Sequence, residues 1–292
     1  MSVLFALATS LLIGFADFGG GLLARRIPAL TVVVASQAVT VVVLGAVVAA
    51  TGAWTAADAR LWYAVAAGAI GPAAMLCFYR ALALGPMGVV SPLGSVGVAV
   101  PVAVGIAVGE RPGLVQLAGA GVAVAGVVLA GGPELRGTPV RRGVLALTLL
   151  AALGFGAVMA LISQASSTVP GLFLALCTQR LTNVAVGGGA LWAASRRGAA
   201  VLPAGPEGAG ARRVLLAALP ALAVVGLADV AANGTYSVAA HSGPVTVAAV
   251  LASLYPVVTA LTARGVLGER LRTVQAAGAG LALAGALLLA VP

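Results

Sequence analysis

Long apolar stretches, interrupted by short polar or charged segments, run the full length of this 292-residue chain. No Asp, Glu, Lys or Arg occurs in residues 27–57, 81–109, 143–179, 230–263 and 273–292. A helix needs about 20 apolar residues to cross the hydrocarbon core of a bilayer, so stretches of this length predict transmembrane helices. The stretch 143–179 can hold most of two such helices, with a turn near 166–170. The pattern predicts a polytopic membrane protein.

Turn residues and charges divide the chain into ten predicted spans. These spans are residues 3–24, 29–50, 61–82, 87–108, 114–130, 143–164, 171–194, 214–239, 245–266 and 274–290. Most links between them are short, so consecutive helices should be antiparallel neighbours. We therefore expect an all-α membrane protein with ten transmembrane helices.

The two halves of the chain repeat each other. The matching segments are 36–40 with 178–182, 79–86 with 236–244, 109–111 with 268–270, and 115–126 with 274–285. Five spans per half is an odd number, so the second half should enter the membrane in the opposite sense. Inverted five-helix repeats are a transporter architecture, with the binding site near the midplane. We divide the chain into a first repeat (1–131), a cytoplasmic linker (132–142) and a second repeat (143–292).

Composition narrows the function classes. Hydrophobic residues make up 61% of the chain and charged residues only 8%, whereas soluble domains carry about 25% charged residues. This excludes a soluble enzyme, a nucleic-acid binder and a disordered chain. The absence of lysine and of a phosphate-binding loop also excludes an ATP-driven pump formed by this chain alone.

The net charge of +9 is better explained by membrane orientation than by an anionic partner such as nucleic acid. Thirteen of the 16 arginines lie in or beside the links after the odd-numbered spans, whereas only Arg60 and Arg111 lie on the other face. Because cytoplasmic links are rich in arginine, this predicts odd-numbered links in the cytoplasm and both termini outside. We expect a multi-pass protein of the plasma (inner) membrane.

Several of these motifs resemble the drug/metabolite transporter superfamily, specifically ten-helix proteins with two EamA-type repeats, over essentially the whole chain. The resemblance is carried by Phe78-Tyr79-Arg80-Ala81-Leu82 before Gly85-Pro86, by the paired Gly-Glu-Arg turns, and by the small-residue last helix of each repeat. Arg180 fits the arginine that such repeats carry in their second helix, where the first repeat has Ala38. The resemblance implies a secondary transporter, with efflux of a small metabolite, amino acid or drug-like compound by alternating access.

Three charged residues lie within predicted spans, clear of the span ends: Asp17, Arg180 and Asp229. Charges at membrane depth are rare because they are costly, so each needs an explanation. Arg180 could form a buried ion pair with one of the aspartates, or bind a carboxylate or phosphate of the substrate. Either aspartate could load and release a proton and so couple transport to the proton gradient.

Polar residues near these charges are further candidates for a substrate cavity. Asp229, Asn233 and Tyr236 share one helix face at spacings i, i+4 and i+7. Gln37, Tyr255 and Thr259 are expected to line the same cavity.

The rival hypothesis is an intramembrane aspartyl-type hydrolase with Asp17 and Asp229 as its dyad. It is weakened because the Tyr-Asp and Gly-x-Gly-Asp motifs of such proteases are absent. We expect no enzyme activity, no metal and no cofactor. The expected partners are the small-molecule substrate and the lipid bilayer, and the protein should be a monomer or a homodimer.

Glu110 and Glu269 should lie on opposite membrane faces, each complementing the N-terminus of the helix that follows it. A structural role is therefore expected for both.

Overall fold

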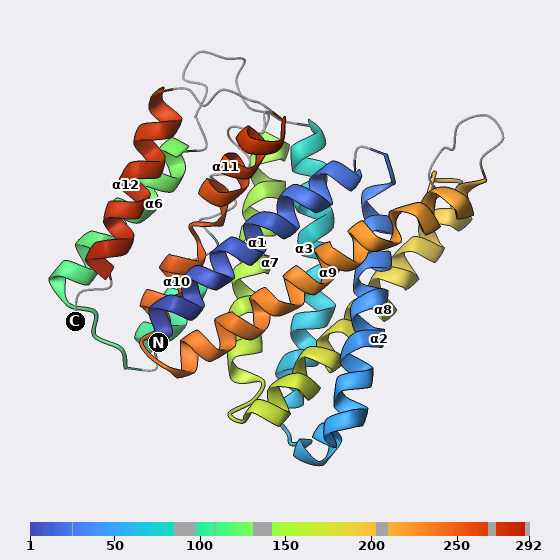
Figure 1. Ribbon diagram of the computed structural model, residues 1–292, viewed down its shortest axis with the longest axis horizontal. Coiled ribbons are helices and arrows are strands. Elements are labelled where there is room, and N and C mark those ends of the chain that lie inside the picture. Colours follow the sequence, from blue (N-terminus) through green and yellow to red (C-terminus); the bar gives the residue numbers. More distant parts are fainter. Residues whose placement is uncertain are drawn as a thin grey trace.

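In the computed structural model the chain is a bundle of helices that run back and forth between two ends (Figure 1). The structure describes residues 1–24, 26–84, 97, 99–107, 109–130, 142–202, 210–267 and 273–289. Within these ranges every regular element is helical. This is expected for a bilayer protein, because a helix satisfies its backbone hydrogen bonds internally.

The helices follow the predicted spans closely. The first half contains α1 (Ser2–Ala24), α2 (Ala29–Thr51), η1 (Ala53–Ala56), α3 (Leu61–Leu84), α5 (Ala99–Ala107) and α6 (Leu114–Ala130). The second half contains α7 (Arg142–Gln164), α8 (Val169–Arg196), α9 (Ala211–His241), α10 (Val245–Ala252), α11 (Tyr255–Leu267) and α12 (Thr273–Leu289). Of the predicted span 87–108, only 97 and 99–107 lie among the described residues.

Six described helices, α1, α2, α3, α7, α8 and α9, are long and apolar enough to cross a membrane. Shorter apolar helices cover 114–126 and the region 245–259. Large apolar side chains such as Leu11, Val42, Leu150 and Val224 are exposed on the outside of the bundle. Such a surface suits lipid, so the chain is a multi-pass membrane protein.

The helices alternate in direction. In Figure 1, α1 begins and α12 ends at the lower side of the bundle, where the links from α2 to α3, α7 to α8 and α9 to α10 also lie. The turn between α1 and α2 lies at the opposite side. This alternation agrees with the short links that the sequence predicted.

Helices from the two halves pack against each other. Across the bundle, α1 packs along α9 and α3 along α7, while α2 packs on α8 and α6 on α12. The halves therefore form one interleaved bundle.

The contact between α6 and α12 depends on small residues. A Cβ added at Gly126 would lie 2.6 Å from the Cα of Ala282, and one added at Gly285 would lie 2.6 Å from the Cα of Ala123. The two helices thus touch backbone to backbone, which is the usual role of glycine in membrane helix packing.

One predicted span, 245–266, consists of two helices. At the break the α-helical hydrogen bonds of α10, which span four residues, are replaced by bonds that span three. Leu254 N–H donates to the Leu251 carbonyl, and Val257 N–H donates to the Leu254 carbonyl. Residue 256 is a proline and has no backbone N–H with which to continue the α10 pattern. Apolarity continues through the break, so hydropathy alone did not reveal it.

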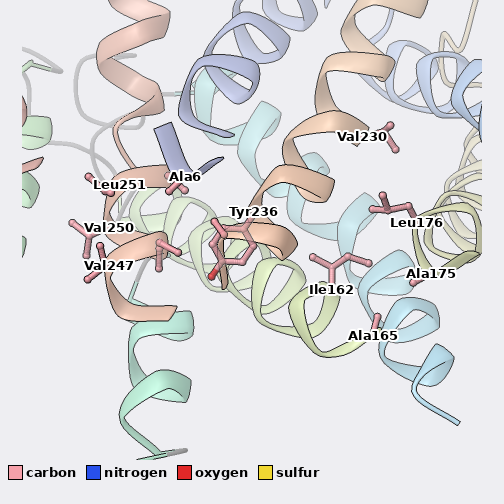
Figure 2. Close-up of a cluster of buried hydrophobic side chains, with 14 of the residues drawn as sticks. Ala6, Ile162, Ala165, Ala175, Leu176, Val230, Tyr236, Val247, Val250 and Leu251 are labelled. Atoms are coloured by element: carbon pink, nitrogen blue, oxygen red, sulfur yellow. The ribbon is translucent and has the colours of Figure 1, made fainter. Parts of the chain in front are cut away.

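The main apolar core lies where α10 meets α9, α7 and α1. Figure 2 shows the ring of Tyr236 on α9 near Val247 and Val250 of α10, with Ile162 of α7 on its other side. These side chains are at most 4% exposed. The core fixes α10 against helices of both halves, including α9 and α1.

Adding a methyl group at the α6–α12 contact should destabilise the protein. Gly126→Ala and Gly285→Ala force the two backbones apart, and we expect the free energy of unfolding to fall by about 1–3 kcal/mol in each variant. Unfolding in detergent micelles measures the effect.

The matched control is Gly121→Ala, because no atom of the described residues lies within 4 Å of a Cβ at that position of α6. It should be neutral, or stabilising by up to about 1 kcal/mol through helix propensity. Equal effects at Gly121 and Gly126 would contradict the proposed contact.

Candidate functional site

Arg180 lies near the middle of α8 and is only 2% exposed. Its Nη1 donates a hydrogen bond of 2.7 Å to Oδ2 of Asp229 on α9, and the two charges form an ion pair. An unpaired charge at this depth costs about 3 kcal/mol or more, which explains why the arginine has a partner. Of the two aspartates that the sequence offered, the structure selects Asp229.

Gln37 on α2 binds both members of the ion pair. Arg180 Nη1 donates to Gln37 Oε1 at 2.8 Å, and Gln37 Nε2 donates to Asp229 Oδ2 at 3.0 Å. The three side chains therefore form a closed ring of hydrogen bonds. Because α2 belongs to the first half of the chain, and α8 and α9 to the second, this network joins the two halves.

Asn233 lies one turn after Asp229 on α9 and supports its carboxylate. Asn233 Nδ2 donates to the backbone carbonyl of Asp229 at 2.9 Å and lies 3.5 Å from Oδ1, the oxygen that Arg180 leaves free. The Asp229 side chain is still 31% exposed, whereas that of Arg180 is 2% exposed. The network is therefore closed around the arginine and open on the side of the aspartate.

Two glycines allow close helix contacts around this network. A Cβ at Gly226 on α9 would lie 2.5 Å from the carbonyl oxygen of Ser36 on α2. A Cβ at Gly68 on α3 would lie 2.7 Å from the Cβ of Thr182 on α8. A larger side chain at Gly226 would push α9 away from α2, the helices that carry Asp229 and Gln37, whereas one at Gly68 would push α3 away from α8.

The neighbourhood of Arg180 has unused hydrogen-bonding capacity. The Nε of Arg180 and the side-chain oxygens of Gln179 and Asn183 have no partner among the described residues. All three side chains are more than nine-tenths buried. Buried polar groups are nearly always paired in native proteins, so a polar ligand or ordered water would be stabilised here.

Asp17 lies beside the network on α1 without joining it. It is half-buried and makes no hydrogen bond or ion pair with a described residue. Its carboxylate is close enough to interact electrostatically with Asp229 and with the phenol of Tyr255. Tyr255 begins α11, and Thr259 of the same helix donates to the Gly14 carbonyl on α1 at 3.3 Å. These residues form a second polar cluster, at the α1–α11 contact.

A family model described as the EamA-like transporter family matches residues 1–132 and 141–291. The chain belongs to this family. The two matches divide the EamA-like chain into halves, of which the first carries Gln37 and the second carries Arg180 and Asp229. The ring of hydrogen bonds therefore connects the two family units of the protein.

A solved crystal structure has the same fold as this EamA-like protein. Its sequence is 17% identical, the TM-score is 0.73, and the alignment covers 98% of this chain and 95% of the other. At this identity the similarity shows the fold alone. No curated protein sequence matches the chain.

The structure groups most of the residues that we expected to line a cavity. One group consists of Gln37, Arg180, Asp229 and Asn233. The other consists of Asp17, Tyr255 and Thr259. Tyr236 lies apart from both, fully buried in the apolar core of Figure 2, and its hydroxyl has no partner among the described residues. The roles of all these residues in binding and coupling remain predictions.

Glu110 makes a contact that the sequence reasoning missed. We expected it to complement the start of α6, the helix that follows it. Its carboxylate instead accepts hydrogen bonds from Val245 and Thr246 at the start of α10. The sequence held one signal, because Pro244 before α10 has no side-chain acceptor with which to cap that helix. Its counterpart, Glu269, lies outside the described residues.

Removing only the anion from the ion pair should be costly. Asp229→Asn leaves Arg180 enclosed without a counter-ion, and we expect the free energy of unfolding to fall by about 3–5 kcal/mol. Adding Arg180→Gln removes the second charge and should restore most of that loss. The measurement is unfolding in detergent micelles.

Asp58→Asn, on the exposed link between α2 and α3, is the control and should have little effect. If the double variant were no more stable than Asp229→Asn, the coupling between the two charges would be refuted.

Proposed function

We propose that this protein is a secondary active transporter that exports a small metabolite, amino acid or drug-like compound by alternating access, driven by the proton gradient across the plasma (inner) membrane. Membership of the EamA-like transporter family supports small-molecule transport. The observation that carries the proposal is the Arg180–Asp229 ion pair, which lies between helices of membrane-spanning length.

The ion pair suits substrate binding because it is incompletely satisfied. Arg180 has an unpaired Nε, and Asp229 is open on one side. A planar guanidinium binds a carboxylate or phosphate through two parallel hydrogen bonds. An anionic group of the substrate could therefore take the place of Asp229 on Arg180, with the amide of Gln37 beside it.

The helix contacts support ten spans arranged as two inverted repeats. Helices α1, α2 and α3 of the first half correspond to α7, α8 and α9 of the second. With this correspondence, the α1–α9 contact is equivalent to the α7–α3 contact, and the α2–α9 contact to the α8–α3 contact. The close approaches at Gly226 and Gly68 correspond in the same way. The break between α10 and α11 is also typical of transporters, in which discontinuous helices border the site.

The two aspartates also raise the possibility of an intramembrane aspartyl-type hydrolase. Its dyad would need the carboxylates of Asp17 and Asp229 about 3 Å apart, so that they share a proton. In the described part of the chain, Oδ2 of Asp229 binds Arg180 and Gln37, and no hydrogen bond joins this aspartate to Asp17. The arginine contact and the family membership both favour transport over hydrolysis.

Asp17 supports proton coupling. Arg180 neutralises Asp229, whereas Asp17 has no cationic partner among the described residues although it lies close to Asp229. An intramembrane carboxylate without a counter-ion is a suitable carrier of a proton. Binding and release of a proton at Asp17 would change the electrostatic environment of the neighbouring ion pair.

Reconstitution into proteoliposomes tests the proposed function. Flux of carboxylates, amino acids and phosphorylated metabolites is measured with and without an imposed proton gradient. We expect gradient-dependent flux of at least one of these compounds, with a loss of about tenfold or more in the Arg180→Gln/Asp229→Asn variant. The absence of flux in correctly inserted wild-type protein would contradict transport of these compounds.

Asp17→Asn should uncouple transport from the proton gradient. The amide cannot load a proton, so uphill accumulation should fall by about tenfold or more, whereas exchange of labelled for unlabelled substrate should stay within about twofold of wild type. Both rates are measured in the same proteoliposomes. Asp58→Asn serves as the carboxylate control, and an unchanged gradient dependence in Asp17→Asn would rule out Asp17 as the proton carrier.

A further inference from the structure

Glu110 connects two elements that lie 135 residues apart in the sequence. Its Oε1 accepts from the N–H of Val245, and its Oε2 accepts from the N–H and Oγ1 of Thr246 at 3.0 and 2.8 Å. The first N–H groups of a helix have no carbonyl partner within that helix, and they carry partial positive charge. Glu110 therefore supplies the cap that Pro244 cannot provide for α10.

Two glycines shape the place of this carboxylate. Gly109 has φ of +101°, a conformation that favours glycine, and it forms the turn that precedes Glu110. A Cβ at Gly105 would lie 2.7 Å from Glu110 Oε2 and 3.0 Å from Thr246 Oγ1. The Glu110 N–H also donates to the Gly105 carbonyl at 3.0 Å. The backbone on the α5 side thus holds Glu110 in one position.

The contact joins the first repeat to the divided span of the second, α10 and α11. Glu110 lies in the link from α5 to α6, whereas α10 belongs to the second half and leads directly into α11. The first residue of α11, Tyr255, lies beside Asp17. The start of α10 is at the end of the bundle where α1 begins and α9 ends (Figure 1). A displacement of α10 at this end would therefore be transmitted through α11 to the polar cluster of Asp17, Tyr255 and Thr259.

We infer that Glu110 is a positioning residue of the transport cycle, whose carboxylate latches the two repeats together at the end of the bundle where α1 begins. This rests on the proposed function, since a latch matters only if the repeats move relative to each other. Opening of the cavity toward this end requires Glu110 to part from Val245 and Thr246.

The chemistry of the contact suits a latch that opens and closes. Glu110 is half-buried and forms no ion pair within the described part of the chain, so its charge is balanced by backbone N–H groups and one hydroxyl. Water can replace such partners at the membrane surface, so each bond contributes only modestly to stability. The contact thus stabilises the closed arrangement without locking it permanently.

Distance measurements between spin labels test the latch without any substrate. The labels are placed on the full chain in nanodiscs at Ala103 of α5 and Ser242 after α9, both exposed, with Cys77 and Cys177 replaced by alanine. Glu110→Gln removes the charge, and we expect the ratio of the long-distance to the short-distance population to rise by about three- to tenfold.

Two milder variants keep the test decisive if Glu110→Gln fails to fold. Thr246→Val removes only the hydroxyl bond and should raise the ratio by about two- to threefold. Gly105→Ala displaces the carboxylate without changing its chemistry and should act in the same direction. Asp58→Asn changes a carboxylate in the α2–α3 link at the same end of the bundle and should leave the ratio unchanged.

Wild-type distance distributions in all folded variants of Glu110, Thr246 and Gly105 would overturn the latch. Because the distances are measured without substrate, this result would leave the proposed transport function standing. A shifted distribution in a protein without flux would instead support the latch and refute transport of the compounds in the panel.

Discussion

A guanidinium group in the middle of a membrane helix must be neutralised where it stands, and the arrangement of α2, α8 and α9 follows from this requirement. Arg180 cannot turn toward water, so a carboxylate and an amide acceptor have to approach it from neighbouring helices. Gly226 allows α9, which carries the carboxylate, to lie close to α2, which carries the amide. The candidate site and the packing between the two halves are therefore consequences of the same charge.

This requirement makes the two repeats unequal. In the repeat alignment Ala38 stands where the second repeat has Arg180. Three residues after the close helix contacts at Gly68 and Gly226, α3 has Gly71 whereas α9 has Asp229. Both charges are thus missing from the first repeat, which contributes Gln37 instead. A duplicated fold can in this way hold one polar site rather than two, formed by charges from one half and an amide from the other.

The sequence predicted those parts of the structure that depend on local composition. Apolar length and turn residues placed the described helices, and the rarity of charge singled out Arg180 and both aspartates. It did not say which aspartate pairs with Arg180, because this depends on how α8 packs against α9 and α1. Hydropathy also did not reveal the break before Tyr255, since the span is apolar on both sides of it, and Pro256 was the one local signal.

The long-range partner of Glu110 was unpredictable for a related reason. A carboxylate beside a helix start in sequence is an obvious cap for that helix, but the hydrogen bonds go to whichever N–H groups the packing brings closest. Both Glu110 and Arg180 join the repeats, yet they differ in what can replace their partners. Water can take over the bonds of a half-buried carboxylate at the membrane edge, whereas Arg180, at 2% exposure, would lose its counter-ion with nothing in its place. If the repeats move as proposed, they would part at the Glu110 end before the ion pair is disturbed, and the pair would open only when another anion binds Arg180.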